Sequence, residues 1–231
     1  MVAMSAARCP QDYCYICAQP LAGTPQDIEH VVPASLFVRK KKAKGLITLP
    51  AHKSCNSGFS LDDEHFRLCV AALSVPHDAA AKKVWDGPTM RGFHRSEMPG
   101  LKMDILNSLH PVEVHTEGGL YLGTAEMLLR EPGRILGVVN RISRGLYAKR
   151  TGNVLAEDFP VSSDWIDPNA AVPVFKLLNM TLLSVGEGEF CYAWGHLRED
   201  EQEGLFWMIF YNTVHFWGYI GTKLRDVLGT S

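Results

Sequence analysis

The chain has 231 residues, of which 46% are hydrophobic and 21% are charged, with 25 acidic and 23 basic side chains. This composition is typical of one or two globular domains and excludes a disordered tail or a collagen-like fibre. A chain of this length buries a substantial core without disulfide bonds, so its six cysteines need not be cross-links. The formal net charge of -2 gives no sign of a nucleic-acid partner, because proteins that bind phosphates usually carry a positive excess.

The charge is nevertheless unevenly distributed. Residues 1–55 hold seven basic and three acidic side chains, a net charge of +4, whereas residues 56–231 hold 16 basic and 22 acidic ones, a net charge of -6. The sequence therefore predicts a basic amino-terminal module on an acidic body.

No signal peptide or membrane span is expected. Residues 1–8 contain no long apolar stretch, and the chain has no uninterrupted apolar run of the roughly 18 residues that a spanning helix needs. We expect a cytoplasmic protein without a membrane partner. In a reducing compartment, paired cysteines bind metal or remain buried thiols more often than they form disulfides.

Residues 1–75 are predicted to form a strand–strand–helix module. Short strands are expected at residues 27–32 and 46–49, with a brief helix or loop at residues 34–44 between them. A helix is expected to follow from Asn56, because large apolar side chains then recur at helical spacing. These side chains are Phe59, Phe66, Cys69, Val70 and Leu73.

A connection and a second part are predicted to follow. Residues 76–100 are rich in proline and glycine, which indicates an irregular connection. Residues 101–231 are predicted to form an α+β body, with a hairpin around Gly118-Gly119. A helix is expected after Pro132-Gly133, and antiparallel strands are expected within residues 189–219. The whole chain is thus predicted to be of the α+β class, and we expect the body to serve targeting, regulation or homo-oligomerisation.

Two pairs of metal-ligand residues stand far apart in the sequence. Cys14 and Cys17 are separated by two residues, as are His52 and Cys55. This spacing lets both side chains of a pair reach one tetrahedral ion, and a Cys₃His set closes the coordination sphere of a structural Zn²⁺. The remaining cysteines, Cys9, Cys69 and Cys191, have no partner at such spacing and are expected to be packing residues or incidental thiols.

Three short motifs, CYIC, EHVVP and HKSCN, occur in residues 14–56. In this order and approximate spacing they resemble the HNH nuclease family, and specifically its zinc-stapled ββα-metal subset. The resemblance covers about residues 14–70, less than a third of the chain. It implies a ββα-metal fold for this module and hydrolysis of phosphodiester bonds.

The resemblance also implies roles for individual residues. His30, whose ordinary pKa of about 6.5 suits a neutral base near physiological pH, would deprotonate the attacking water. Glu29 and Asn56 would present oxygens to a catalytic Mg²⁺ or Mn²⁺. The chain departs from the family pattern at two points, since Glu29 replaces the more usual Asp and the middle Asn of the motif has no counterpart.

A run of basic residues lies between the two halves of this predicted site. We expect it to steer the phosphate backbone toward the site. The nucleic-acid-binding residues predicted in this way are Arg39, Lys40, Lys41, Lys42, Lys44 and Lys53.

Three other features of the sequence bear on the extent of the site. Arginines on the later helix, including Arg134, Arg141 and Arg144, are expected to form a solvated face in preference to an extension of the basic track. The aromatic residues near the carboxy terminus are expected to form a core or an oligomer interface in preference to a base-stacking surface. Helix geometry directs His65 away from Asn56.

The leading functional prediction is a metal-dependent DNA endonuclease, and an RNA substrate is left open. The alternative is a zinc-stabilised nucleic-acid-binding module without cleavage activity, which the absence of the middle Asn favours. A nuclease held inactive until a regulatory partner arrives is a third possibility. It shares the chemistry of the first and differs in having negligible basal activity.

Overall fold

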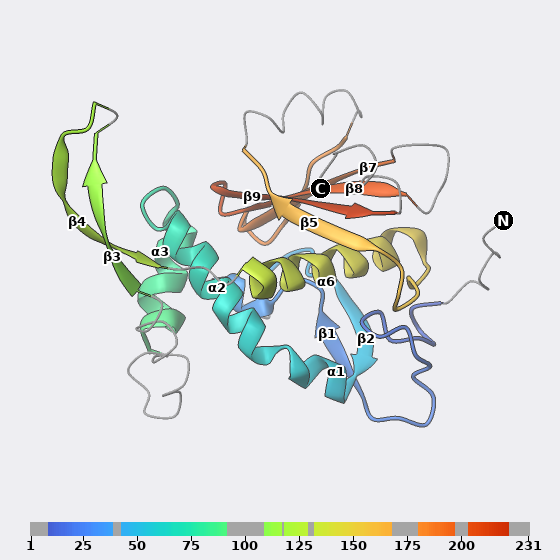
Figure 1. The fold of residues 1–231 in the computed structure, drawn as a ribbon. Coiled ribbons are helices and arrows are strands. Elements are labelled where there is room, and N and C mark those ends of the chain that lie inside the picture. The colour runs from blue at the N-terminus through green and yellow to red at the C-terminus, as the bar shows by residue number, and fades with distance from the viewer. Residues whose placement is uncertain are drawn as a thin grey trace.

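The computed structural model describes the chain in seven segments. These are residues 9–38, 43–91, 109–116, 118–128, 132–167, 180–196 and 203–221. The described part is of the α+β class, and the pairing within each of its three sheets is antiparallel (Figure 1). None of the helices described is long and apolar enough to cross a membrane.

The amino-terminal part begins with an antiparallel strand pair. Strand β1 (Gln26–His30) pairs with β2 (Thr48–His52), so that His30 faces Thr48 across the ladder. The short 3₁₀ helix η1 (Ala34–Leu36) follows β1. Both strands were predicted, but β2 begins two residues and ends three residues later than expected. Pro50 made the end of this strand hard to predict, because proline is uncommon within strands. A two-stranded sheet tolerates its missing N–H group because both strands are edge strands.

Two helices follow where one was expected. Helix α1 (Lys53–Gly58) and helix α2 (Ser60–Ser74) are separated at Phe59, which is the C-cap of α1 and the N-cap of α2. The backbone N–H of Phe59 donates to the Asn56 and Ser57 carbonyls. Of the apolar side chains used to predict the helix, Phe66, Cys69 and Val70 are buried, whereas Leu73 is exposed.

The proline- and glycine-rich segment contains more regular structure than its composition indicates. Helix α3 (Ala79–Val84) begins at Asp78, whose side chain accepts hydrogen bonds from the Ala80 and Ala81 backbone N–H groups. A π-helical turn, η2 (Trp85–Thr89), continues it. The expectation of an irregular segment was wrong for residues 79–89, because a capped helix start outweighs the breakers that follow it. Residues 92–100 lie outside the described part.

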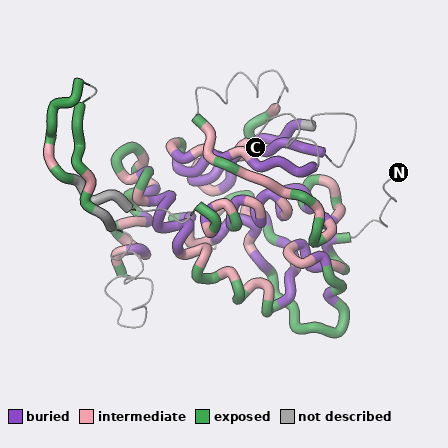
Figure 2. Tube along the Cα trace, in the orientation of Figure 1, coloured by how far each residue is buried: buried purple, intermediate pink, exposed green. Residues whose placement is uncertain are grey.

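Strands β3 (Leu109–His115) and β4 (Tyr121–Leu128) form the predicted hairpin. It projects from the rest of the molecule as a separate two-stranded arm (Figure 1). Its described tip is largely exposed, including Leu120, Tyr121 and Leu122 (Figure 2).

The third sheet has five strands in the order β5-β9-β8-β7-β6. Their bounds are β5 (Val161–Trp165), β6 (Leu183–Val185), β7 (Phe190–His196), β8 (Gly204–Phe210) and β9 (Val214–Ile220). The antiparallel strands predicted within residues 189–219 are confirmed. The acidic segment of residues 197–202 between them lies outside the described part.

Helix α6 (Pro132–Thr151) lies between this sheet and the β1–β2 pair (Figure 1). The apolar stripe predicted for it is confirmed, since Ile135, Val139, Ile142 and Leu146 are all buried. The helix is close to both neighbours. A Cβ added at Gly145 would meet the Val31 side chain at 2.5 Å, and one added at Gly218 of β9 would meet Ser143.

Aromatic side chains join the two parts in one continuous cluster of buried residues. Phe66 of α2 packs edge-on against Phe210 of β8, with ring centroids 5.2 Å apart. Phe206, Phe210 and Phe216 are fully buried, and burial of each such ring contributes about 1.5–3 kcal/mol. These rings are therefore core residues, which is the role predicted for them in preference to base stacking. Trp207 and Trp217, on the opposite face of the sheet, are only partly buried.

Candidate metal centre and its surroundings

The two predicted ligand pairs come together in space. The sulfur atoms of Cys14, Cys17 and Cys55 and a ring nitrogen of His52 all lie within 4.8 Å of one another. The His52 Nδ1 is 3.3 Å from the Cys17 Sγ and 3.8 Å from the Cys55 Sγ. The edge of a tetrahedron with Zn–S of about 2.3 Å and Zn–N of about 2.1 Å is about 3.5 Å, so the cluster has the size that a zinc ion requires.

Local backbone structure brings each pair to the cluster. The Cys14–Cys17 turn is closed by two hydrogen bonds, from the Ala18 N–H to the Cys14 carbonyl and from the Cys14 N–H to the Gln19 carbonyl. Ala18 adopts a left-handed conformation with φ of 58°. His52 is the last residue of β2 and Cys55 lies in the first turn of α1. A metal ion here would tie the turn to the junction between β2 and α1.

The second nitrogen of His52 fixes the ring for metal binding. Its Nε2 lies 3.0 Å from the carbonyl oxygen of Pro20. Since a carbonyl only accepts, Nε2 carries the proton and Nδ1 is left with a lone pair facing the thiols. An outer hydrogen bond of this kind is usual for metal-binding histidines.

The thiols of the cluster disfavour the ionised state when no cation is among them. Burial raises the pKa of the Cys55 thiol to about 12, and the neighbouring thiols act in the same direction. Burial likewise raises the pKa of Cys17. A divalent cation reverses this preference, because it binds the thiolate form and releases the protons. The cluster therefore can hold a metal such as zinc.

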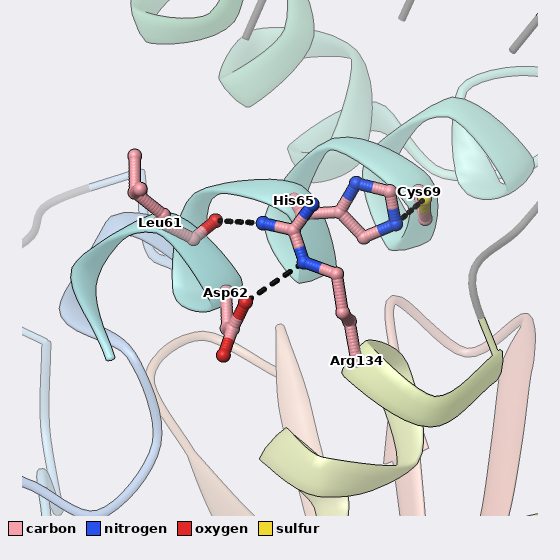
Figure 3. Close-up of polar contacts among 5 residues, drawn as sticks. All are labelled: Leu61, Asp62, His65, Cys69 and Arg134. Atoms are coloured by element: carbon pink, nitrogen blue, oxygen red, sulfur yellow. Dashed lines mark hydrogen bonds and ion pairs between the residues drawn. The ribbon is translucent and has the colours of Figure 1, made fainter. Parts of the chain in front are cut away.

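The other described cysteines lie apart from this cluster. Cys69 is buried on α2, with its sulfur 3.6 Å from the Nε2 of His65 (Figure 3). His65 is itself buried. It thus lies in the protein core beside Cys69. The prediction for His65 assumed one continuous helix from Asn56, whereas the two residues lie on different helices, α1 and α2.

Glu29 and His30 occupy adjacent positions on β1, so their side chains leave the strand on opposite faces. Glu29 is only 7% exposed. Burial raises the pKa of its carboxyl to about 7, Arg141 opposes this shift, and Asp63 adds to it. The backbone N–H of His30 also donates to this carboxylate, and the His30 side chain is half-buried.

Asn56 is held by a residue that the sequence analysis missed. Its Nδ2 donates to the Asp27 carboxylate over 3.1 Å. Among the described residues, no hydrogen bond joins the Asn56 side chain to Glu29 or His30. Asp27 lies two residues before Glu29 and therefore on the same face of β1. This alternation was the available signal for including Asp27 in the site.

A buried arginine lies behind Glu29. Arg141 of α6 is 3% exposed and forms an ion pair with Asp63 of α2. Its guanidinium also lies over the Phe59 ring, 4.8 Å from the centroid. Nothing in the sequence signalled this contact, because the partners are 78 positions apart.

The expectation of a solvated basic face on α6 was wrong for Arg134, Arg141 and Arg144, whereas Lys149 and Arg150 in its last turn are exposed. Arg134 donates to the Asp62 carboxylate over 2.8 Å and to the Leu61 carbonyl (Figure 3). Arg144 donates to the backbone carbonyls of Ala156 and Phe159. These arginines are engaged because α6 lies inside the molecule, where their charges need partners.

The predicted basic residues are only partly described. Residues 39–42, which contain Arg39, Lys40, Lys41 and Lys42, lie outside the described part. Lys44 and Lys53 are exposed. Lys53 lines an open groove of about 620 Å³ beside the metal cluster. Its other lining residues are Thr24, Pro25, His52, Ser54 and Ser57.

Comparison with known proteins adds no relative. No model of a known protein family matches the chain, and neither the curated proteins nor the solved structures contain a match. The fold and the site therefore define an α+β protein with a Cys₃His cluster able to hold a metal. The resemblance to HNH nucleases rests on the three short motifs alone.

Proposed function

We propose that this protein is a metal-dependent HNH-type endonuclease that hydrolyses phosphodiester bonds of DNA. The observation that carries the proposal is the junction of β2 and α1. There the Cys₃His cluster is followed directly by Asn56, and Asn56 is hydrogen-bonded to the strand that carries Glu29 and His30. The motif residues span more than 40 positions of sequence and come from the Cys14–Cys17 turn, the β1–β2 strand pair and the helix that follows it.

The proposed mechanism assigns one task to each group. His30 accepts the proton of the attacking water. The side-chain oxygens of Glu29 and Asn56 suit Mg²⁺ or Mn²⁺, which prefer oxygen ligands. Such a cation, when bound, neutralises charge on the phosphate and the departing oxygen. Zinc in the Cys₃His cluster would tie the Cys14–Cys17 turn to the junction of β2 and α1 and would take no part in bond breaking.

The test is cleavage of supercoiled plasmid by the zinc-loaded chain in the presence of Mg²⁺, Mn²⁺ or EDTA. We expect nicked or linear product with either cation, none with EDTA, and none from His30→Ala with either cation. His77→Ala is the matched control, because His77 is exposed on the turn after α2. Equal cutting by His30→Ala and wild type would remove the assignment. Single-stranded DNA and RNA, tested alongside, determine the substrate class.

The burial of Glu29 favours a second candidate, a zinc-stabilised nucleic-acid-binding module without cleavage. A carboxyl that is 7% exposed and flanked by Arg141 is less accessible to a hydrated cation than an open site would be. This function predicts DNA binding that weakens steeply with salt, is unchanged in His30→Ala, and yields no product with any cation. Cleavage that depends on a divalent cation would exclude it.

A further inference from the structure

We propose that Asp27 is a positioning residue that orients the Asn56 amide for cation binding. The inference rests on the proposed function, because it concerns the same site. Asp27 faces Ala51 across the β1–β2 ladder, one position before the zinc-cluster residue His52. This register places its carboxylate next to the first turns of α1, where Asn56 lies.

Both oxygens of the Asp27 carboxylate are already engaged. One, Oδ2, accepts from the Asn56 Nδ2 over 3.1 Å, and the other, Oδ1, accepts from the Ile28 backbone N–H over 2.9 Å. The backbone contact fixes the carboxylate on the strand. The carboxylate in turn fixes one end of the Asn56 amide.

The fixed end determines what the free end offers. An asparagine amide has a donor end and an acceptor end, and only the acceptor oxygen can bind a cation. Because a carboxylate only accepts, Asp27 selects the Nδ2 end of Asn56 and leaves Oδ1 for the cation. Without an acceptor at position 27 the amide is free to rotate, and half of its orientations present N–H groups toward a positive charge.

Asp27 acts through Asn56 and is not itself assigned as a cation ligand. Substitution separates these roles. Asp27→Ala removes both the acceptor and the charge. In the Asn56→Asp background there is no amide to orient, so Asp27→Ala should then change Mn²⁺ binding only if the Asp27 carboxylate is a ligand or acts through its charge. Asp12→Ala controls for the loss of one negative charge, since Asp12 is exposed in the same amino-terminal part of the chain.

The experiment measures Mn²⁺ binding to the zinc-loaded full chain by electron paramagnetic resonance, together with urea unfolding and the Mg²⁺ dependence of plasmid cleavage. We expect Asp27→Ala to weaken Mn²⁺ binding by about tenfold or more, as loss of an outer hydrogen bond to a metal ligand typically does. Asp12→Ala should bind Mn²⁺ nearly as wild type, and Asp27→Ala should cause no further loss of Mn²⁺ affinity in the Asn56→Asp background. Saturating Mg²⁺ should restore the cleavage rate of Asp27→Ala, since positioning affects cation affinity rather than the chemical step.

Two results would overturn the inference. If Asp27→Ala weakens Mn²⁺ binding as strongly in the Asn56→Asp background as in wild type, the carboxylate acts as a ligand or through its charge. If Asp27→Ala binds Mn²⁺ as wild type does, the contact has no functional role. Either result can occur while wild type cleaves in a His30-dependent manner, in which case the proposed function stands. A wild-type protein that neither binds Mn²⁺ nor cleaves would instead remove the proposed function, and this inference with it.

Discussion

Arg141 of α6 donates to the carboxylate of Asp63 on α2 in a nearly dry environment, with the arginine 3% exposed and the aspartate side chain 19% exposed. The same guanidinium lies near Glu29 of β1 and over Phe59 at the α1–α2 junction. Two of its nitrogens, Nε and Nη1, and the nearby Tyr15 hydroxyl are buried without a hydrogen-bond partner among the described residues. Bridging water is the usual partner of such groups.

The buried ion pair between Arg141 and Asp63 predicts a large loss of stability when Arg141 is replaced. Arg141→Met should lower the free energy of unfolding by about 3 kcal/mol or more, because it leaves the Asp63 carboxylate largely buried without its counter-charge. Arg134→Met is the matched change on the same helix and breaks the ion pair with Asp62, whose partners are 25% and 35% exposed. It should cost about 1 kcal/mol or less. Urea unfolding of the two variants measures both, and equal losses would contradict the argument.

The close approach of α6 to Val31, the residue after β1, predicts that replacing glycine with alanine has opposite effects at two positions of the helix. Gly145→Ala places a methyl group 2.5 and 2.7 Å from the two Cγ atoms of Val31, and such overpacking costs about 1–3 kcal/mol. Gly137 lies on the same helix, is exposed, and has nothing within 4 Å of its added Cβ. Gly137→Ala should therefore raise stability by up to about 1 kcal/mol. Thermal unfolding of both variants gives the sign directly, and a stabilising Gly145→Ala would show that α6 does not pack as described.

The Cys₃His cluster predicts stoichiometric metal and its loss in single variants. Wild type should purify with one zinc per chain, measured by elemental analysis. Cys55→Ser should lose zinc and unfold at lower denaturant, because a structural zinc contributes its binding free energy to folding. Cys9 is exposed and outside the cluster, so Cys9→Ser should retain both zinc and stability. Zinc retained at full occupancy in Cys55→Ser would remove Cys55 from the ligand set.

His215 predicts a loss of stability in mild acid. Burial lowers its pKa below the ordinary value of 6.5, although Asn212 and Asp167 oppose the shift. Its Nδ1 also accepts from the Trp207 Nε1 over 3.1 Å, which requires the neutral ring. Since the unfolded chain takes up this proton more readily, stability is complete above pH about 6.5 and falls as the pH is lowered toward the folded-state pKa.

The pH effect is isolated by comparing variants between pH 7 and pH 5. His215→Gln should lose less unfolding free energy over this interval than wild type, since it has no proton to bind there. His77→Gln, at an exposed site, should lose as much as wild type. An identical decline in wild type and His215→Gln would assign the acid sensitivity to other groups.

The sequence by itself determined features that depend on local spacing. The pairs Cys14–Cys17 and His52–Cys55 identified the ligand cluster, because two intervening residues allow both side chains of a pair to reach one ion. The apolar stripe on α6 and the alternation of buried and less buried residues in β8 and β9 could be predicted, because the periodicity of side chains is set within a single helix or strand. The division of the helix at Phe59 was missed because the helical spacing of apolar residues continues past it. The capped start of α3 at Asp78 was missed because proline and glycine residues lie on both sides of this helix.

Only the tertiary structure decided which polar groups meet. Asn56 contacts Asp27 rather than Glu29, and Arg141 lies beside Glu29 from a helix that the sequence placed in a separate body. Such contacts are set by how α6 packs between the sheet and the β1–β2 pair, and residue spacing contains no record of that packing. A charged side chain has the same sequence signature whether it is solvated or buried, so its partner is known only once the burial of its helix is known.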